Sequence, residues 1–260
     1  MNTNANTTEL LGKKIFFLYP STVVQNMIIT ELIQQEYEVY ETKDHAALRR
    51  VLKRYPDSIV FAHINEQMPE REWEAWIRGL VNDPETKNTM IGVISASADE
   101  ALQQKYLNAI KVQCGFTVLK SDLNSSIKQI CGKLIAANAK GRRKFLRTIT
   151  GNETNATINL PMNGTYINGT IKDISTAGIS CAFGKDPVLK KNALFKDIQI
   201  KLQSVLLRVE AIVLGSRADT DGTEATYILL FTPKVDPETK TKIRKYIHQN
   251  LQTKMDAELK

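Results

Sequence analysis

Two arginines four positions apart, Arg143 and Arg147, are the side chains in this chain best suited to hold an anion. They follow a stretch of small and polar residues, 136–141, and Arg142 stands beside them as a third guanidinium. Each guanidinium is a planar fork that can grip a phosphate through two hydrogen bonds, pair with a purine edge or stack on a base. The spacing therefore indicates a site for a ligand that carries both phosphate and a planar ring.

A second group of polar residues follows about 25 positions later, where Asp173, Ser175 and Gly178 lie in sequence typical of β-strands. A carboxylate accepts hydrogen bonds from the N–H groups of a guanine edge, and a hydroxyl holds a phosphate oxygen or its own turn. Glycine allows a close approach to the backbone. Each motif alone has an ordinary explanation, as solvated basic surface or as a turn. Together and in this order they favour a small anionic ligand that contains guanine.

The two motifs resemble the RxxxR and (D/N)xSxxG signature of PilZ domains, the bacterial receptors for cyclic di-GMP, over roughly residues 141–252. The ligand-binding residues that this resemblance implies are Arg142, Arg143, Arg147, Asp173, Ser175 and Gly178. The arginines would clamp the ligand, and the other three would line a pocket on the surface of a β-barrel. The resemblance also implies cyclic di-GMP as the ligand with no further cofactor, and a downstream protein partner.

The residues around these motifs alternate between apolar and polar with the period of β-strands. Six short strands at close spacing predict an antiparallel barrel or sandwich, at 156–160, 165–171, 178–183, 195–202, 205–214 and 225–231. Apolar residues at helical spacing after Pro237 predict an amphipathic closing helix. We therefore expect a PilZ-like β-barrel with a C-terminal helix over 148–260, preceded by a linker and ligand-clamping arm over 140–147.

Strand-like and helix-like segments alternate five times over residues 13–139, after an N-terminal segment, 1–12, that we expect to be flexible. This pattern predicts a doubly wound parallel α/β sheet with right-handed crossovers. Trp73 and Trp76 have clear helical spacing and are expected to lie in a core or an interface rather than at a cofactor.

This first half resembles the receiver domain of response regulators, with Lys120 in the place of the receiver lysine and Ser95 or Ser97 in that of the hydroxyl. Ala62 stands where receivers carry the phosphoacceptor aspartate, and residues 17–20 replace the acidic pair that holds magnesium. Without those carboxylates the domain has neither a hard-cation site nor an aspartyl nucleophile. We expect a degenerate receiver-like scaffold. Whether His63 or Lys120 keeps a role is open.

Composition narrows the class of protein. A chain of 260 residues with 42% hydrophobic residues is large enough for about two domains with cores of their own. No apolar run reaches the length of a membrane-spanning helix, no signal peptide is recognisable, and the three cysteines are scattered. These observations predict a cytoplasmic protein without membrane insertion, disulfides or a metal site. The dispersed serines, histidines and acids form no nucleophile constellation, so we expect no enzyme.

The positive charge is concentrated in the second half. Residues 1–139 carry 15 Lys and Arg against 16 Asp and Glu, whereas residues 140–260 carry 20 against 12. A positive field speeds the association of an anionic ligand, but it would also suit nucleic acid. The alternatives to a cyclic di-GMP receptor are therefore a nucleic-acid-binding regulator, which we regard as unlikely, and an adaptor that has lost ligand binding. The partner, the process controlled, the oligomeric state and the number of ligands per chain are left open.

Overall fold

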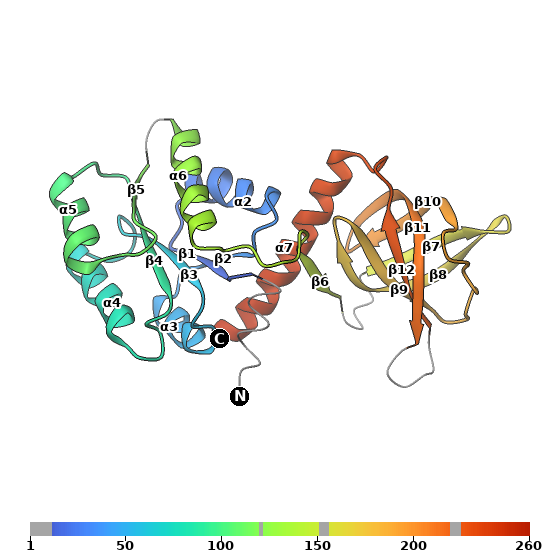
Figure 1. Ribbon diagram of the computed structural model, residues 1–260, viewed down its shortest axis with the longest axis horizontal. Helices are drawn as coiled ribbons and strands as arrows, with labels where there is room; N and C mark the ends of the chain where they lie inside the picture. Colours follow the sequence, from blue (N-terminus) through green and yellow to red (C-terminus); the bar gives the residue numbers. More distant parts are fainter. Residues whose placement is uncertain (1–11, 120–121, 151–155, 219–224) are drawn as a thin grey trace. The chain divides into compact units, whose positions relative to one another are not determined.

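The computed structural model describes residues 12–119, 122–150, 156–218 and 225–260 (Figure 1). The chain divides into two compact units. The first comprises residues 1–144 and 251–260, and the second comprises residues 145–250. Lys120 and all of the expected flexible N-terminus except Gly12 lie outside the described residues.

The first unit contains a five-stranded parallel sheet in the order β2-β1-β3-β4-β5 (Figure 1). Its strands are β1 (Ile15–Leu18), β2 (Val39–Thr42), β3 (Ile59–His63), β4 (Met90–Ser95) and β5 (Phe116–Val118). The helical segments between and after them are η1 (Val24–Ile29), α2 (Thr30–Gln34), α3 (His45–Arg54), α4 (Glu70–Asn82), α5 (Glu100–Gln104), η2 (Lys105–Ile110) and α6 (Leu123–Ala136). The prediction of a doubly wound parallel fold is confirmed.

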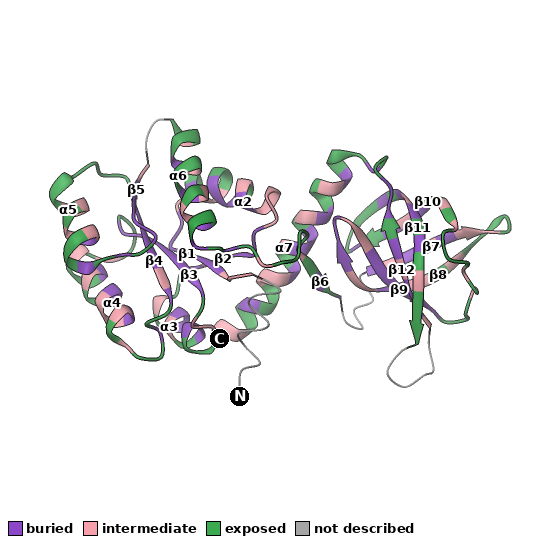
Figure 2. Ribbon diagram, viewed as in Figure 1, coloured by how far each residue is buried: buried purple, intermediate pink, exposed green. Residues whose placement is uncertain are grey.

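The core lies on both faces of this sheet, as the buried strands in Figure 2 show. Successive residues of β1 alternate between the two sides, because side chains along a strand point to opposite faces. Phe16 packs with the apolar residues of α3, α4 and η2, while Phe17 packs with those of η1, α2 and α6. A strand covered on both faces must be apolar throughout, which explains the continuous apolar run that begins the domain.

A cluster of aromatic side chains lies at the carboxyl ends of β1 and β3. A receiver domain would carry its carboxylates at these positions. Tyr19 adopts a left-handed backbone (φ 52°), and its hydroxyl lies 3.0 Å from His45 Nδ1. Its ring packs edge-on against Trp73, which in turn packs edge-on against Trp76. Ala62 is fully buried in the same cluster of apolar residues. Both tryptophans therefore belong to the core, as predicted.

The hydroxyl at the end of β4 is engaged in a local turn, since Ser95 Oγ accepts a hydrogen bond from Ser97 N at 3.0 Å. Among the described residues, no group of three or more His, Cys, Asp or Glu is placed to hold a metal ion. Because the fully buried Ala62 stands where a receiver carries its acceptor aspartate, we expect acetyl phosphate to leave this domain unmodified, with an authentic receiver as the positive control. Intact-mass spectrometry would contradict this expectation by showing a stable phosphoryl adduct on residues 13–139.

His63, which ends β3, is buried. Burial lowers the pKa of its imidazole below 6.5, and the nearby carboxylate of Glu66 only partly opposes the effect. The unfolded chain therefore binds more protons than the folded chain at pH values just below 6.5, so stability falls as the pH falls through this range. When the pH is lowered from 7.5 to about 5.5, we expect the melting temperature of His63→Gln to decrease less than that of the wild type. An equal loss in the two proteins would assign the pH dependence to other groups.

The chain ends in the long helix α7 (Pro237–Leu259), whose last residues belong to the first unit rather than to the barrel. Met255 is buried in the part of the core that contains Phe16, and Leu251 and Leu259 pack against that part of the core. Glu258 forms an ion pair with Arg54 at 2.8 Å. The expected boundary of 148–260 thus differs from the structure at its end. The apolar stripe runs on along the helix without a break, so the sequence does not reveal that its two ends serve different cores.

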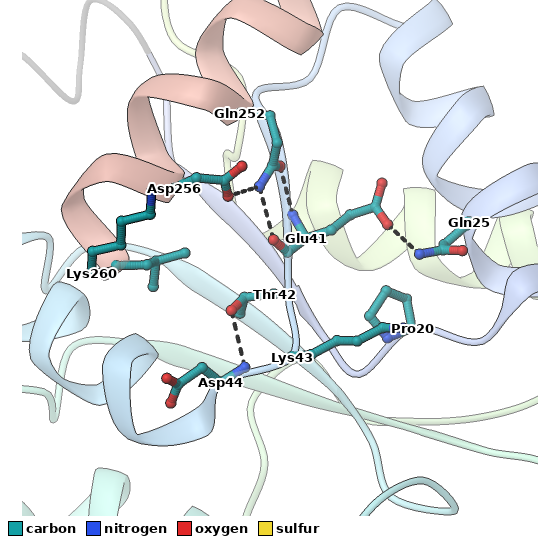
Figure 3. A pocket seen from close by; sticks show the side chains of 10 residues that line it. Pro20, Gln25, Glu41, Thr42, Lys43, Asp44, Gln252, Asp256 and Lys260 are labelled. Atoms are coloured by element: carbon teal, nitrogen blue, oxygen red, sulfur yellow. Dashed lines mark hydrogen bonds between the residues drawn. The ribbon is translucent and has the colours of Figure 1, made fainter.

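An open hollow of about 540 Å³ lies beside this helix end and the edge strand β2 (Figure 3). Gln252 lines this hollow. The amide Nε2 of Gln252 donates to the carbonyl of Glu41, and its Oε1 accepts from the Glu41 N–H, both at 2.9 Å. The Glu41 carboxylate accepts from Gln25 at 2.7 Å. Gln252 therefore holds the end of α7 to β2, and the Glu41 carboxylate joins β2 to η1.

The second unit is a closed antiparallel β-barrel, as predicted. Its sheet order is β6-β8-β7-β10-β11-β12-β9, and pairing of β8 with β9 closes it. The strands are β6 (Arg147–Ile149), β7 (Ala156–Met162), β8 (Thr165–Ser175), β9 (Gly178–Phe183), β10 (Leu194–Leu202), β11 (Val205–Ala218) and β12 (Ala225–Phe231). Alternate residues such as Ile158, Ile200 and Leu229 are buried inside it. The short strand β6 was not expected, because it falls at the end of the anticipated arm.

Candidate ligand-binding site

Strand pairing brings the two sequence motifs together on the barrel. Arg147 on β6 pairs with Ser175 on β8, and Ser175 pairs with Gly178 on β9. In the same way Asp173 pairs with Ile149 on one side and with Ser180 on the other. Side chains opposite each other on neighbouring strands lie only about 5 Å apart. Residues about 30 positions apart in the sequence therefore form two adjacent rows across three strands.

Asp173 links the two rows. One of its carboxylate oxygens, Oδ1, lies 3.6 Å from Arg147 Nη1, and the other, Oδ2, accepts a hydrogen bond from the Ser180 hydroxyl. Arg147 remains half-exposed, and an ion pair of this exposure contributes no more than about 1 kcal/mol. The carboxylate thus orients the guanidinium along the barrel surface but holds it weakly. An incoming phosphate could therefore displace it.

Ser175 shapes the turn between β8 and β9. Its Oγ accepts from the N–H of Ala177 and donates to the carbonyl of Gly178, both at 3.3 Å. The side chain is buried. Of the two roles open to this serine from the sequence, the structure shows the turn, which keeps the two rows in register.

Gly178 is required by the fold itself. A Cβ added here would lie 2.2 Å from the carbonyl oxygen of Leu229 on β12, well inside van der Waals contact. The sequence suggested that this glycine admits a ligand to the backbone. The structure shows that it admits the neighbouring strand, and so closes the barrel beside the site.

The two arginines before the barrel lie outside its strands. Arg142 and Arg143 are exposed and precede β6 in an irregular segment that is grouped with the first unit up to Lys144. The structure therefore brings together four of the six expected residues: Arg147, Asp173, Ser175 and Gly178. Since four residues span at most about 14 Å of extended chain, Arg143 cannot lie far from Arg147.

The expected arm over 140–147 is shorter in the structure. Lys140 pairs with Gly12 in an isolated antiparallel bridge, and its ammonium lies 4.5 Å from the centre of the Tyr37 ring. At the other end, Arg147 already belongs to β6. The expectation that Arg147 lies in the linker and arm is corrected, because its backbone is paired with β8, and residues 141–146 form the irregular connection.

Ser180 is a residue of the site that sequence reasoning missed. It is buried on β9, and its hydroxyl is the hydrogen-bond donor that fixes Asp173. Its position two residues after Gly178 was the available signal, because residues i and i+2 of a strand share a face.

Residues 141–249 match the family model of the PilZ domain, so this part of the chain is a PilZ domain. Among solved structures, the chain is similar to the PilZ domain of YcgR from Escherichia coli with c-di-GMP, at 12% identity and a TM-score of 0.38, over 45% of this chain and 96% of that one. It is also similar to the Bacillus subtilis inhibitor of motility MotI, at 15% identity and a TM-score of 0.38, over 44% and 52%.

A complex of MrkH from K. pneumonia with c-di-GMP is similar at 18% identity and a TM-score of 0.36, over 46% of this chain and 55% of that one. The chain thus spans about half the length of MotI and MrkH. No curated protein matches it significantly. In the described part of the chain, no helix combines the length and the apolar character needed to cross a membrane.

Proposed function

We propose that this protein is a non-enzymatic receptor for cyclic di-GMP. The observation that carries the proposal is the cross-strand row Arg147–Ser175–Gly178 with Asp173 beside it, inside the part of the chain that matches the PilZ domain. The row combines a half-exposed guanidinium with a carboxylate on one patch of barrel surface. These are the groups that a cyclic dinucleotide requires for its phosphates and its guanine edges.

The proposed binding step exchanges partners at Asp173. Arg147 leaves the carboxylate for a ligand phosphate, with which its fork forms two charge-assisted hydrogen bonds. The carboxylate, still fixed by Ser180, then accepts from the N–H groups of a guanine. Arg143 adds a second fork, and Arg142 a third contact. Titration calorimetry with cyclic di-GMP tests this step and also decides between one and two ligands per chain.

The basic charge of the barrel half keeps one alternative in view, a regulator that binds nucleic acid. Such a protein would contact many phosphates, so its affinity would fall steeply with salt concentration. We instead expect binding of cyclic di-GMP to persist with little competition from a 20-base-pair DNA duplex, measured by fluorescence anisotropy at about 150 mM salt. Displacement of the dinucleotide by equimolar duplex would favour the alternative.

We further propose that ligand binding is relayed through the chain on both sides of Arg147. Before it, residues 141–146 connect the units. After it, the Thr148 hydroxyl bonds to the amide oxygen of Asn250 on α7, within the second unit. Helix α7 continues to Gln252, which holds the backbone of Glu41 within the first unit. Fixing the connection at Arg143 and Arg147 can thus change the equilibrium between arrangements of the units, if the ligand binds one arrangement more tightly.

Limited proteolysis tests the relay. Trypsin cleaves after lysine and arginine, and the connection offers Arg142, Arg143 and Lys144, which are exposed. We expect cyclic di-GMP to slow cleavage there by about tenfold, because a bound arginine and its ordered backbone no longer fit a protease. The exposed Lys185, between β9 and β10, is the internal control. Equal rates at the connection with and without ligand would show that the relay does not involve this segment.

A further inference from the structure

We infer that an exposed aliphatic row on the barrel is a docking surface for a protein partner whose apolar contact patch is rimmed by acidic residues. The strand register is the first observation. The row Arg147–Ser175–Gly178 continues in register from Gly178 to Leu230 on β12, then to Ile212 on β11 and Leu194 on β10. One line of paired residues thus runs from the candidate ligand site to three aliphatic side chains.

These side chains face outward, away from the interior of the barrel. Leu194, Ile212, Leu230 and the neighbouring Leu214 are between 38% (Ile212) and 51% (Leu214) exposed. Single exposed aliphatic residues are ordinary, but adjacent ones on paired strands form a patch of the kind that marks an interaction site. We call these four residues the aliphatic row.

The charges around the aliphatic row select the partner. Asn192 and Ala193 hydrogen-bond to Val213 at 2.8 and 3.0 Å, which places the exposed Lys190 and Lys191 beside β11 at one end of the row. Lys196 is exposed two residues beyond Leu194, with the exposed Asp197 next to it, so the net positive charge of the rim comes from Lys190 and Lys191. The nearby acid Glu210 already faces Lys234 at 3.7 Å and accepts from Thr232.

A basic rim around an apolar centre is complementary to an acidic rim around an apolar centre. A second copy of this chain fits less well, since a symmetric contact through the row would bring the lysines of both copies to one interface. A lipid surface fits less well too, because the row lies on paired strands and lacks the aromatic side chains that favour the membrane interface. Protein is therefore the occupant that we propose.

Site-specific photo-crosslinking tests this inference in cells that produce the full-length chain with benzoylphenylalanine at position 212. We expect an adduct with one other protein, crosslinked at an apolar site flanked by Asp and Glu. That protein, once purified, should bind the wild-type chain, and its affinity should fall at least tenfold for Ile212→Asp and for the double variant Lys190→Glu/Lys191→Glu. Leu206→Asp is the matched control, since Leu206 is a 59% exposed aliphatic residue on the same strand outside the row. Its affinity should be unchanged.

Three results would overturn the inference: an adduct only with a second copy of the chain or with lipid, no adduct at all, or a purified partner that binds Ile212→Asp as tightly as the wild type. The melting temperature of each variant checks that it is folded. Repeating the binding measurement with Arg147→Ala separates this inference from the proposed receptor function. Arg147 lies at the opposite end of the line of paired residues from the aliphatic row. If the partner still binds Arg147→Ala, the docking surface is supported even if cyclic di-GMP proves not to be the ligand.

Discussion

Arg147→Ala is expected to weaken cyclic di-GMP binding by about two orders of magnitude or more, to the limit of calorimetric detection. A charge-assisted, two-pronged hydrogen bond to phosphate is lost, and each hydrogen bond to a charged group contributes roughly 1.5–3 kcal/mol. The fold should be almost unaffected, because Arg147 is half-exposed and its ion pair with Asp173 is only partly buried. Arg143→Ala should weaken binding similarly, since the second fork is lost.

Arg217→Ala is the matched control for both variants. Arg217 is an exposed arginine on β11 of the same barrel, so its removal changes the net charge equally without touching the candidate site. We expect its affinity to lie within about twofold of the wild type, with the small difference due to the long-range field. If all three variants bound alike, the contribution of the arginines would be general electrostatic attraction rather than a clamp.

Gly178→Ala is expected to destabilise the barrel by about 1–3 kcal/mol, the usual cost of forcing an added group into a packed site. The new methyl group would meet the Leu229 carbonyl oxygen, which belongs to the backbone of a paired strand and cannot rotate away. Each kcal/mol corresponds to roughly 4–8 °C in Tm for a domain of about this size. Ligand binding should fall as well, because β9 carries the glycine and Ser180 of the site.

Gly184→Ala provides the comparison, since Gly184 directly follows the same strand and an added Cβ there would have no heavy atom within 4 Å. Its Tm should stay within about 4 °C of the wild type, because a small surface change rarely exceeds ±0.5 kcal/mol. Equal losses of Tm in the two variants would mean that the close approach of β9 and β12 is not what Gly178 provides.

The parallel sheet and the barrel were predictable from the sequence because each buries its strands in a distinct way. Fully covered strands such as Ile15–Leu18 are apolar throughout, and barrel strands such as Leu194–Leu202 mostly alternate. Strand β6 was missed, since three residues with Arg147 at their start carry no recognisable period. The division of α7 was missed because Ile247 and Leu251 continue one apolar stripe, although they belong to different units.

Within the candidate site, residue types alone did not predict the structural roles of Ser175 and Gly178. Arg147 and Asp173 form an ion pair on the barrel surface. Ser175 instead hydrogen-bonds within its own turn, and Gly178 makes room for the neighbouring strand β12. The reason is physical. Which backbone atoms lie near a serine or a glycine depends on strand register, and register between distant strands is fixed by the barrel as a whole.

The central claim is that this chain binds cyclic di-GMP through Arg147 and the neighbouring Asp173. Titration calorimetry of cyclic di-GMP into the full-length wild-type protein, alongside Arg147→Ala and Arg217→Ala, tests it most directly. The account predicts saturable binding that is retained in Arg217→Ala and lost in Arg147→Ala, with the melting temperatures of all three proteins alike. Absence of binding to the folded wild-type protein, or unchanged binding in Arg147→Ala, would contradict it.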